Sequence, residues 1–300
     1  MGTIAIAGMG RMGANMARRL LKNGITPHVW NREPEKLPAL AKEGAVTAAT
    51  LTELVGGMQG PRAVWMMIPA GDATEKLFLG LLSLLQKGDL IIDGANGNWK
   101  DAVRRAAKAA EAGIGFVDAG VSGGIWGLAN GYCVMAGGDE GHYAQAEPYI
   151  KALCQEGGYM RCGGPGAGHF TKMVHNGIEY AMMEAYGEGF ELLKASPFGG
   201  MDMAALSRTW NSGSVIRSWL LELAQNSFDK DPRLERVAGV VADSGEGRWT
   251  VEEAARLGVP APAISAALFK RFTSQDKDNY GDRLMAALRR EFGGHATTAK

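Results

Sequence analysis

Short apolar runs alternate with stretches of helical periodicity along the first half of the chain. The apolar runs lie at residues 3–8, 27–30, 62–69, 89–94, 115–120 and 132–138. Helical patterns, for example at 99–112 and 139–154, lie between most of them. Apolar strands that alternate with helices are typical of a mostly parallel sheet with helices on both faces. We therefore predict an α/β fold whose N-terminal domain is doubly wound.

The strand pattern stops near residue 165, and the remainder has the periodicity of helices. These helices are predicted at 168–195, 202–211, 214–228, 250–257, 262–274 and 279–291. The segment "CGGPGAGH" (162–169) separates the two halves, because its glycines and proline interrupt regular elements. A length of 300 residues agrees with about two domains. We predict an α/β domain over residues 1–164 and an all-helical domain over residues 165–300.

Composition excludes several classes of function. Hydrophobic residues make up 46% of the chain, enough for a sizeable core, and 32 basic residues balance 32 acidic ones. A net charge of zero gives no electrostatic reason to expect nucleic acid as a partner. No apolar run is long enough to span a membrane, and no group of carboxylates has the pattern of a metal site. We expect neither a metal nor a membrane.

Cysteine usage and the first residues indicate a compartment. The three cysteines, Cys133, Cys154 and Cys162, have neither the even number of a disulfide framework nor the spacing of a zinc site. The sequence "MGTIAIAG" enters a strand pattern at once, without the basic n-region and the cleavage site of a signal peptide. We expect a protein of the reducing cytoplasm.

The first predicted strand is followed directly by a glycine-rich loop. In "IAIAGMGRMGANMARRL", Gly8, Gly10 and Gly13 stand between the strand and a helix. In a Rossmann-type domain such glycines allow a tight turn, a close approach of the backbone to a pyrophosphate and close helix–strand packing. The alternative is a plain strand–turn–helix. We predict a dinucleotide cofactor in contact with Gly8, Gly10, Arg11, Met12, Gly13, Asn31, Arg32, Ile68, Pro69 and Asn96.

The end of the second strand bears on the choice of cofactor. About 20 residues after the glycine loop, a carboxylate that binds the adenosine ribose would favour NAD. The chain has Asn31 and Arg32 there, and a guanidinium suits the 2′-phosphate of NADP. Glu33 acts in the opposite sense, and Arg32 could also be merely solvated. We predict NADP in preference to NAD.

A second glycine cluster and a polar helix supply candidate substrate contacts. "DAGVSGGIWGLANG" (118–131) places Ser122, Gly123 and Gly124 after a strand, where they form either a substrate contact or an ordinary turn.

In "GHFTKMVHNGIEY" (168–180), helical spacing puts Lys172, Asn176 and Glu179 on one face, with His175 and Tyr180 beside them. Their neighbours are apolar, which indicates a largely buried helix, and buried charges need partners or a role. A desolvated lysine is a plausible base and a glutamate a plausible acid. The alternative is a solvated polar stripe.

Distinctive motifs run along the whole chain: "GMGRMGANMA", "WNREPEK", "DGANGNW", "VSGG", "GHFTKMVHNGIEY", "DSGEGRWT" and "RREFGGH". Through these motifs the sequence resembles the 6-phosphogluconate dehydrogenases of the β-hydroxyacid dehydrogenase superfamily. This resemblance implies oxidative decarboxylation of 6-phosphogluconate to ribulose 5-phosphate with NAD(P), by a short form of the enzyme.

The resemblance also implies roles for individual residues. Lys172 would be the base, Glu179 the acid and Asn176 their neighbour in the catalytic group. The sugar acid would be lined by Asn96, Ser122, Gly123, Gly124, His175 and Asn176. Its phosphate would be held by Tyr180, Arg271, Arg289 and His295. In long members of the family the C-terminal segment reaches the active site of the neighbouring subunit. The resemblance therefore implies a homo-oligomer, with residues 165–300 as the domain for substrate binding and oligomerisation.

One segment departs from the family pattern. Long members carry a Lys-Gly-Thr-Gly-Lys-Trp run where this chain has "DSGEGRW" (243–249), so different phosphate contacts are expected.

Two other functions remain open at this point. One is another superfamily enzyme that acts on a non-phosphorylated 3-hydroxy acid without decarboxylation, as 3-hydroxyisobutyrate dehydrogenase does. The other is a non-catalytic NADP-binding protein.

Overall fold

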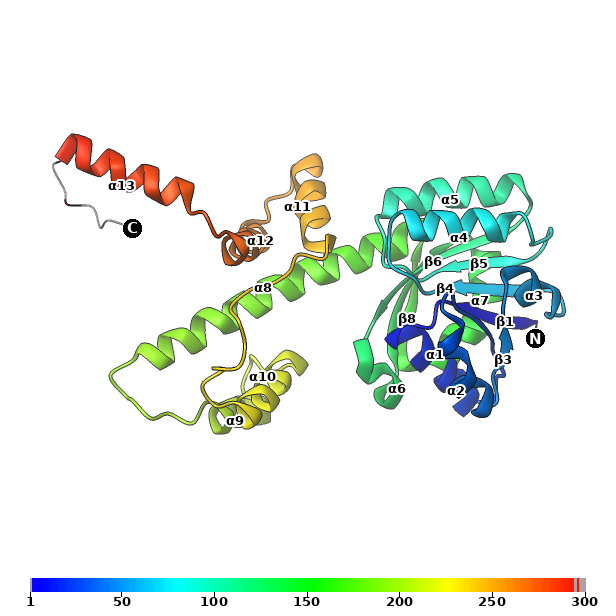
Figure 1. The fold of residues 1–300 in the computed structure, drawn as a ribbon, viewed down its shortest axis with the longest axis horizontal. Helices are drawn as coiled ribbons and strands as arrows, with labels where there is room; N and C mark the ends of the chain where they lie inside the picture. The colour runs from blue at the N-terminus through cyan, green and yellow to red at the C-terminus, as the bar shows by residue number, and fades with distance from the viewer. Residues whose placement is uncertain (1, 294–295, 297–300) are drawn as a thin grey trace. The chain divides into compact units, whose positions relative to one another are not determined.

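The computed structural model describes residues 2–293 and 296. The chain divides into two compact units, residues 1–176 and 177–300. Helix α8 (Ala167–Ala195) contains the boundary between them (Figure 1). We predicted a domain boundary between residues 164 and 165, before this helix, whereas the compact units divide within it.

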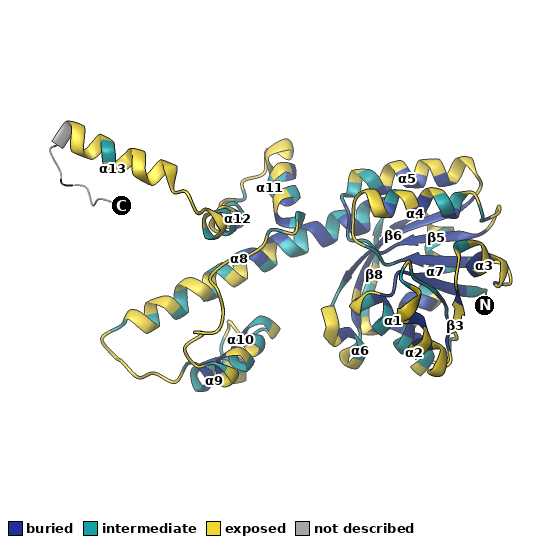
Figure 2. Cartoon of the chain, in the orientation of Figure 1, coloured by how far each residue is buried: buried dark blue, intermediate teal, exposed yellow. Residues whose placement is uncertain are grey.

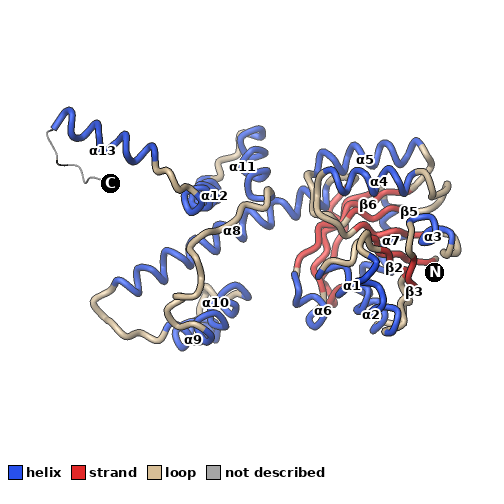
Figure 3. The backbone as a smooth tube through the Cα atoms, in the orientation of Figure 1, coloured by secondary structure: helices blue, strands red, loops and turns tan. Residues whose placement is uncertain are grey.

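The first unit is built on one eight-stranded sheet. Its strands are β1 (Thr3–Ala7), β2 (His28–Trp30), β3 (Val46–Ala48), β4 (Arg62–Met66), β5 (Leu90–Asp93), β6 (Gly115–Ser122), β7 (Tyr132–Gly138) and β8 (Cys154–Gly163). They follow the order β3-β2-β1-β4-β5-β6-β7-β8, and every neighbouring pair is parallel except β6 and β7. The predicted, mostly parallel sheet is therefore confirmed, and Figure 3 shows its strands among the helices of this unit.

Both faces of this sheet are buried under helices. Ile4 and Ile6 of β1 belong to one apolar cluster, whereas Ala5 and Ala7 belong to another. Alternate residues of a strand point to opposite faces, so the sheet is doubly wound. The helices of this unit are α1 (Arg11–Lys22), α2 (Leu37–Lys42), α3 (Leu51–Gly56), α4 (Asp72–Leu82), α5 (Trp99–Glu111), α6 (Gly127–Asn130) and α7 (Glu140–Leu153). The first cluster includes residues of α1, α2 and α7, and the second includes residues of α3, α4 and α5. Figure 1 shows α1 and α5 on opposite sides of the sheet.

Two strands were not predicted from the sequence, and both lie at the edges of the sheet. β3 has three residues, of which only Ala48 is buried, so no alternating pattern develops. β8 reads "CQEGGYMRCG", is mostly exposed or half-buried, and pairs with β7 alone. An edge strand with polar and glycine residues carries little hydrophobic signal, and here pairing with the neighbouring strand defines it.

The described residues of the second unit form helices joined by loops and contain no strand, as predicted. Besides the second half of α8, it contains α9 (Met203–Gly213), α10 (Trp219–Lys230), α11 (Glu246–Leu257), α12 (Pro262–Gln275) and α13 (Tyr280–Gly293). The prediction was wrong about the start of α10. The helix begins at Trp219 because the Ser218 hydroxyl accepts a hydrogen bond from the Leu221 amide. Fewer residues are buried here than in the sheet unit (Figure 2).

Candidate active site

The glycine loop has the geometry that close backbone contact requires. Gly8 follows β1 with φ +112°, and a Cβ there would come within 2.3 Å of the Met67 carbonyl oxygen. A Cβ on Gly13 would come within 2.0 Å of the Gly8 oxygen, so α1 begins directly against the loop. A Cβ on Gly10 would meet nothing within 4 Å. The space over Gly10 at the N-terminus of α1 is therefore open, which fits a pyrophosphate.

Asn31 braces this loop through hydrogen bonds. Its Oδ1 accepts from the Met9 amide at 2.8 Å, and its Nδ2 donates to the Glu33 carbonyl at 2.9 Å. Gly8 also donates to the Trp30 carbonyl at 2.8 Å. The end of β2 is thus tied to the glycine loop.

Arg32 stands next to this brace with its side chain 85% exposed. Its Nη2 lies 4.0 Å from the Glu33 carboxylate. Glu33 is also paired with Lys36, whose hydrogen bond is the main reason that the pKa of Glu33 is lowered. The Arg32 guanidinium is accessible to an anion, while Glu33 and Lys36 partly neutralise each other.

Asn96 connects the loop after β5 to the end of β6. Its backbone has φ +52°, and its side-chain amide both donates to the Val121 carbonyl (3.0 Å) and accepts from the Val121 amide (2.9 Å). This pairing fixes the residue that precedes the Ser122-Gly123-Gly124 turn. Gly123 and Gly124 have φ +114° and +53°, a conformation that favours glycine. The turn is therefore held from the neighbouring strand.

The first turns of α8 bring four of the predicted residues together. Lys172 Nζ donates to Asn176 Oδ1 at 2.7 Å and lies 3.3 Å from His175 Nδ1. His175 Nε2 lies 3.4 Å from the Ser122 hydroxyl. Lys172 is only 5% exposed. Ser122, Lys172, His175 and Asn176 thus form one polar group between β6 and α8, which we call the lysine cluster.

Gly120 of β6 has no side chain, and this allows α8 to pack closely against the strand. A Cβ on Gly120 would come within 2.4 Å of the Lys172 Cβ. Any larger residue at position 120 would push α8 and its lysine away from Ser122.

The second unit holds Tyr180 in a separate polar group. The Arg271 guanidinium lies 3.3 Å from the centre of the Tyr180 ring and donates to the Ala242 carbonyl at 2.7 Å. The Tyr180 hydroxyl accepts from the Ser244 amide at 3.2 Å and lies 3.0 Å from the Ser244 hydroxyl. Asp243, also near the tyrosine hydroxyl, binds Arg248 with a contact of 3.0 Å. The segment 243–249, which departs from the family pattern, therefore surrounds Tyr180.

The remaining predicted residues are placed as follows. Glu179 is half-buried on α8, next to Tyr180 in the chain. Ile68 and Pro69 follow β4, where the Pro69 carbonyl accepts from Thr74. Arg289 is exposed on α13, and His295 lies outside the described residues.

The expectation that α8 is largely buried was wrong beyond its first turns. Ile178 is 51% exposed and Met182 is 38% exposed, whereas Met173 is 2% exposed. Helical spacing alone did not separate the buried start of the helix from its continuation in the second unit.

Sequence reasoning missed a set of buried charges below the lysine cluster. Asp118 of β6 and Asp93 of β5 are fully buried. Asp93 pairs with Arg105 at 3.0 Å, and its carbonyl oxygen lies 3.0 Å from His169 Nε2. An aspartate inside the apolar run "GFVDAG" was a signal that could have revealed Asp118.

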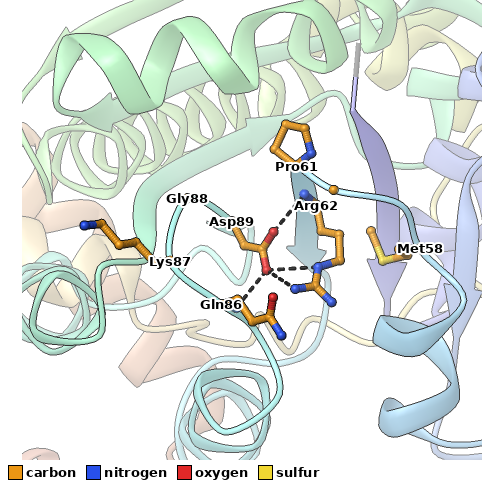
Figure 4. A pocket seen from close by; sticks show the side chains of 8 residues that line it. Met58, Pro61, Arg62, Gln86, Lys87, Gly88 and Asp89 are labelled. Carbon is orange, nitrogen blue, oxygen red and sulfur yellow. Dashed lines mark hydrogen bonds and ion pairs between the residues drawn. The ribbon is translucent and has the colours of Figure 1, made fainter.

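A cavity of about 440 Å³ lies elsewhere, at the amino ends of β4 and β5 (Figure 4). Its wall contains Asp89, which accepts from the Arg62 and Gln86 amides and from the Arg62 guanidinium. The glycine loop follows the carboxyl end of β1, at the opposite edge of a parallel sheet. The cavity therefore does not belong to the cofactor site.

Among the described residues, no three histidines, cysteines, aspartates or glutamates are grouped so that they could hold a metal ion. Within the same residues, no helix is long and apolar enough to cross a membrane.

The fold and the lysine cluster define a two-domain dehydrogenase with a nicotinamide dinucleotide cofactor. Residues 3–163 match the family model of the NAD binding domain of 6-phosphogluconate dehydrogenase, and residues 168–296 match that of its C-terminal domain. The chain belongs to the 6-phosphogluconate dehydrogenase family. The resemblance predicted from the sequence is thereby confirmed.

Individual relatives support this assignment. The NAD(+)-dependent, decarboxylating 6-phosphogluconate dehydrogenase of Haloferax volcanii is 38% identical over 99% of both chains. The decarboxylating enzyme of Lactococcus lactis is 36% identical over 91% of this chain, which spans 61% of the length of that relative.

Solved structures agree. The 6-phosphogluconate dehydrogenase of Plasmodium falciparum superposes with a TM-score of 0.82 at 28% identity over 99% of this chain and 66% of the other. The 3-hydroxyisobutyrate dehydrogenase of Mycobacterium tuberculosis has a TM-score of 0.72 at 23% identity over 89% of this chain and 91% of the other, which shows a shared fold.

Proposed function

We propose that this protein oxidises 6-phosphogluconate and releases its C1 carboxylate as CO2, forming ribulose 5-phosphate and reduced NAD(P). The observation that carries the proposal is the lysine cluster, in which a buried amine lies beside an amide, an imidazole and a hydroxyl. Family membership supplies the substrate and the reaction type.

In this proposal Lys172 is the base of the oxidation. A neutral amine that donates one hydrogen to Asn176 Oδ1 keeps a lone pair for the proton of the substrate C3 hydroxyl. A bound nicotinamide would supply the acceptor for the hydride that leaves C3. Lys172, now charged, polarises the new C3 ketone, which is the electron sink for loss of the C1 carboxylate. Ser122 and His175 orient the hydroxyl groups of the sugar acid.

Glu179 completes the reaction as the acid. Loss of CO2 leaves an enediol whose C1 must take up a proton. Glu179 lies two turns after Lys172 on the same helix, so helical spacing carries both side chains to one side of α8. We assign to Glu179 the protonation of C1.

The substrate phosphate is assigned to the polar group around Tyr180. Arg271 offers a guanidinium that is fixed over the tyrosine ring, and such a group binds phosphate through two parallel hydrogen bonds. Arg289 and His295 of the C-terminal segment are the further candidates. Asp243 and Glu246 add negative charge to this region, so the arginines must supply the counter-charge.

The cofactor is proposed to be NADP in preference to NAD. The Arg32 side chain at the end of β2 supports this choice, because it is 85% exposed, lies as far as 4.0 Å from the Glu33 carboxylate and suits a 2′-phosphate. Glu33 next to it limits the preference.

We also propose a homo-oligomer whose C-terminal segment contributes to the neighbouring site. Apolar side chains of the second unit are exposed in the single chain, including Leu192 (73%), Phe198 (74%) and Val215 (99%). Exposed apolar surface on this scale is typical of an interaction site. The free thiols of Cys133, Cys154 and Cys162 suit a reducing compartment, and we place the enzyme in the cytoplasm.

The experiment that tests the function assays the purified protein with 6-phosphogluconate and with 3-hydroxyisobutyrate, each with NAD and with NADP. Reduction of the cofactor coupled to release of CO2 from C1 of 6-phosphogluconate is expected. Turnover of 3-hydroxyisobutyrate alone would replace this function with that of a non-decarboxylating relative.

The shared site has a separate test. Two inactive variants, Lys172→Met and the double variant Arg289→Ala with His295→Ala, are mixed after dissociation. Hybrids that pair an intact lysine with an intact C-terminal segment should regain activity. Hybrids that form without activity would contradict sharing.

A further inference from the structure

Helix α8, which carries the lysine cluster, begins without a capping side chain of its own. Gly166 precedes its first residue, and its carbonyl accepts the first helical hydrogen bond from the Phe170 amide at 2.9 Å. Gly166 has φ +92°, and a Cβ there would come within 2.6 Å of the Val103 side chain. Serine, threonine or aspartate, the usual N-cap residues, cannot replace it without strain.

Asp118 of β6 caps the helix instead. One carboxylate oxygen accepts from the Gly166 amide at 2.6 Å and the other from the His169 amide at 2.7 Å. An aspartate at an N-cap position binds the same kind of amide, but this one comes from a strand far away in the sequence. Its negative charge also faces the positive end of the helix dipole. The two hydrogen bonds and the interaction with the helix dipole together orient α8 relative to β6.

The close packing of the start of α8 against the sheet leaves little room for the helix to move. A Cβ on Gly168 would come within 2.4 Å of the Asp118 carbonyl oxygen, and one on Gly137 within 2.6 Å of the Gly168 amide. The backbone of α8 therefore lies directly on β6 and β7. Together with Gly120 beneath Lys172, these glycines fix the distance between helix and sheet, while the Asp118 carboxylate fixes the position along the strand.

Burial of the Asp118 carboxylate in the sheet costs free energy, because it removes a charged group from water. Asp118 is fully buried, and burial is the main cause that raises its pKa, with Asp93 acting in the same direction. The amides of His169 and Gly166, and the charge of His169, act in the opposite direction. A residue that breaks the apolar pattern of a central strand is often retained for function.

We propose that Asp118 is a positioning residue that sets the register between the two halves of the active site. Ser122 lies on the same strand as Asp118, whereas Lys172 and His175 lie on the helix that it caps. The 3.4 Å contact between Ser122 and His175 depends on that register. This inference rests on the proposed function, in which both halves must meet at one substrate carbon.

The test is Asp118→Asn. The variant keeps the shape but turns one acceptor oxygen into an amide group that faces a donor N–H. Displacement of a catalytic group by about 1 Å can lower a rate on the order of 100-fold. We expect kcat, counted per cofactor-binding site, to fall 10- to 100-fold. The dissociation constant of NADPH should change less than about 2-fold, because the glycine loop is on another part of the sheet.

A kinetic isotope effect separates positioning from simple loss of folded protein. With 6-phosphogluconate deuterated at C3, the primary isotope effect on kcat should increase in Asp118→Asn, because proton removal and hydride transfer become slower than the other steps. A reduced fraction of folded enzyme would lower the rate and leave the isotope effect as in the parent.

Asp89→Asn is the matched control. Asp89 is also buried and accepts from two backbone amides, at the amino ends of β4 and β5 (Figure 4). This variant should lose stability while it keeps the parent kcat per cofactor-binding site and the parent isotope effect.

Three results would overturn the proposal. The first is parental kcat and isotope effect in Asp118→Asn. The second is an equal loss of kcat in Asp89→Asn. The third is failure of both Asp118→Asn and the milder Asp118→Ser to bind NADPH, which would make Asp118 a determinant of folding.

Inactivity of the parent would reject the proposed function instead of the role of Asp118. In that event crystal structures of the parent and of Asp118→Asn test the positioning role of Asp118 directly. A longer distance between Ser122 and His175 in the variant is expected, and an unchanged distance would reject the positioning role.

Discussion

Lys172 Nζ donates a 2.7 Å hydrogen bond to Asn176 Oδ1, one turn further along α8. The bond holds the amine in place within a group that is shielded from water, where it can take a proton from the substrate. Lys172→Met should lower kcat by at least the 10²–10⁴-fold typical of a lost base. Lys108→Met, on the exposed side of α5, is the control. Stopped-flow turnover measures kcat, and NADPH titration measures the affinity for the cofactor. Near-parental turnover in Lys172→Met would reject the assignment.

Glu179 is expected to act after the hydride has left. Glu179→Gln keeps the shape of the side chain and removes its proton, so kcat should fall by roughly 10²–10⁴-fold. In deuterated water the parent should place deuterium at C1 of ribulose 5-phosphate with one stereochemistry. If the variant labels C1 at the parental rate and with the same stereochemistry, another group supplies the proton.

Arg32 and Glu33 should control the choice of cofactor in opposite directions. Arg32→Ala removes the only charge that we assign to the 2′-phosphate, so kcat/KM for NADP should fall much more than kcat/KM for NAD. Glu33→Gln removes a nearby negative charge and should increase the ratio in favour of NADP. Lys36→Ala, which removes the ion-pair partner of Glu33, is the variant with which the cofactor preference of Glu33→Gln is compared. Equal losses for both cofactors in Arg32→Ala would limit that residue to a structural role.

Arg271 should bind the substrate phosphate through a guanidinium held over the Tyr180 ring. Arg271→Lys keeps the charge but loses the planar fork and its stacking, so KM for 6-phosphogluconate should rise while KM for NADP is unchanged. Gluconate, which lacks the phosphate, is the matched substrate. Its kcat/KM should be affected much less by the substitution, and an equal effect on both substrates would contradict the phosphate contact.

Glu75 should make the stability of the sheet unit sensitive to acid. The pKa of Glu75 is lowered to about 2, first because Arg104 donates hydrogen bonds to it and then because Arg105 does so. Its folded pKa lies below the ordinary value of 4.5, so the stability that it contributes is present above that pH. That stability is lost as the pH falls from about 4.5 towards about 2.

Glu75→Gln tests this dependence. Urea unfolding at pH 6 and at pH 3 should show a smaller difference in unfolding free energy for the variant than for the parent. Glu111→Gln, an exposed change at the end of α5, should keep the parental difference. The same pH dependence in Glu75→Gln as in the parent would exclude the contribution of this carboxylate.

The fold class could be predicted from the sequence because its signals are local. Alternation of apolar strands and helices, and the glycines that follow β1, depend on residues close together in the chain. The polar face of α8 was also visible from helical spacing, which correctly grouped Lys172 with Asn176. The two missed strands, β3 and β8, have no such signal, because pairing with a neighbour defines them.

Only the tertiary structure decided which groups meet. Asn96 bonds with Val121, and Ser122 meets His175, across loops that no periodicity spans. The sequence by itself determined that a lysine helix follows a dinucleotide fold. The structure decided that this helix is capped by Asp118 from β6. The reason is that a hydrogen bond between distant residues needs a folded backbone to bring donor and acceptor together, and a one-dimensional pattern records only what neighbouring residues require.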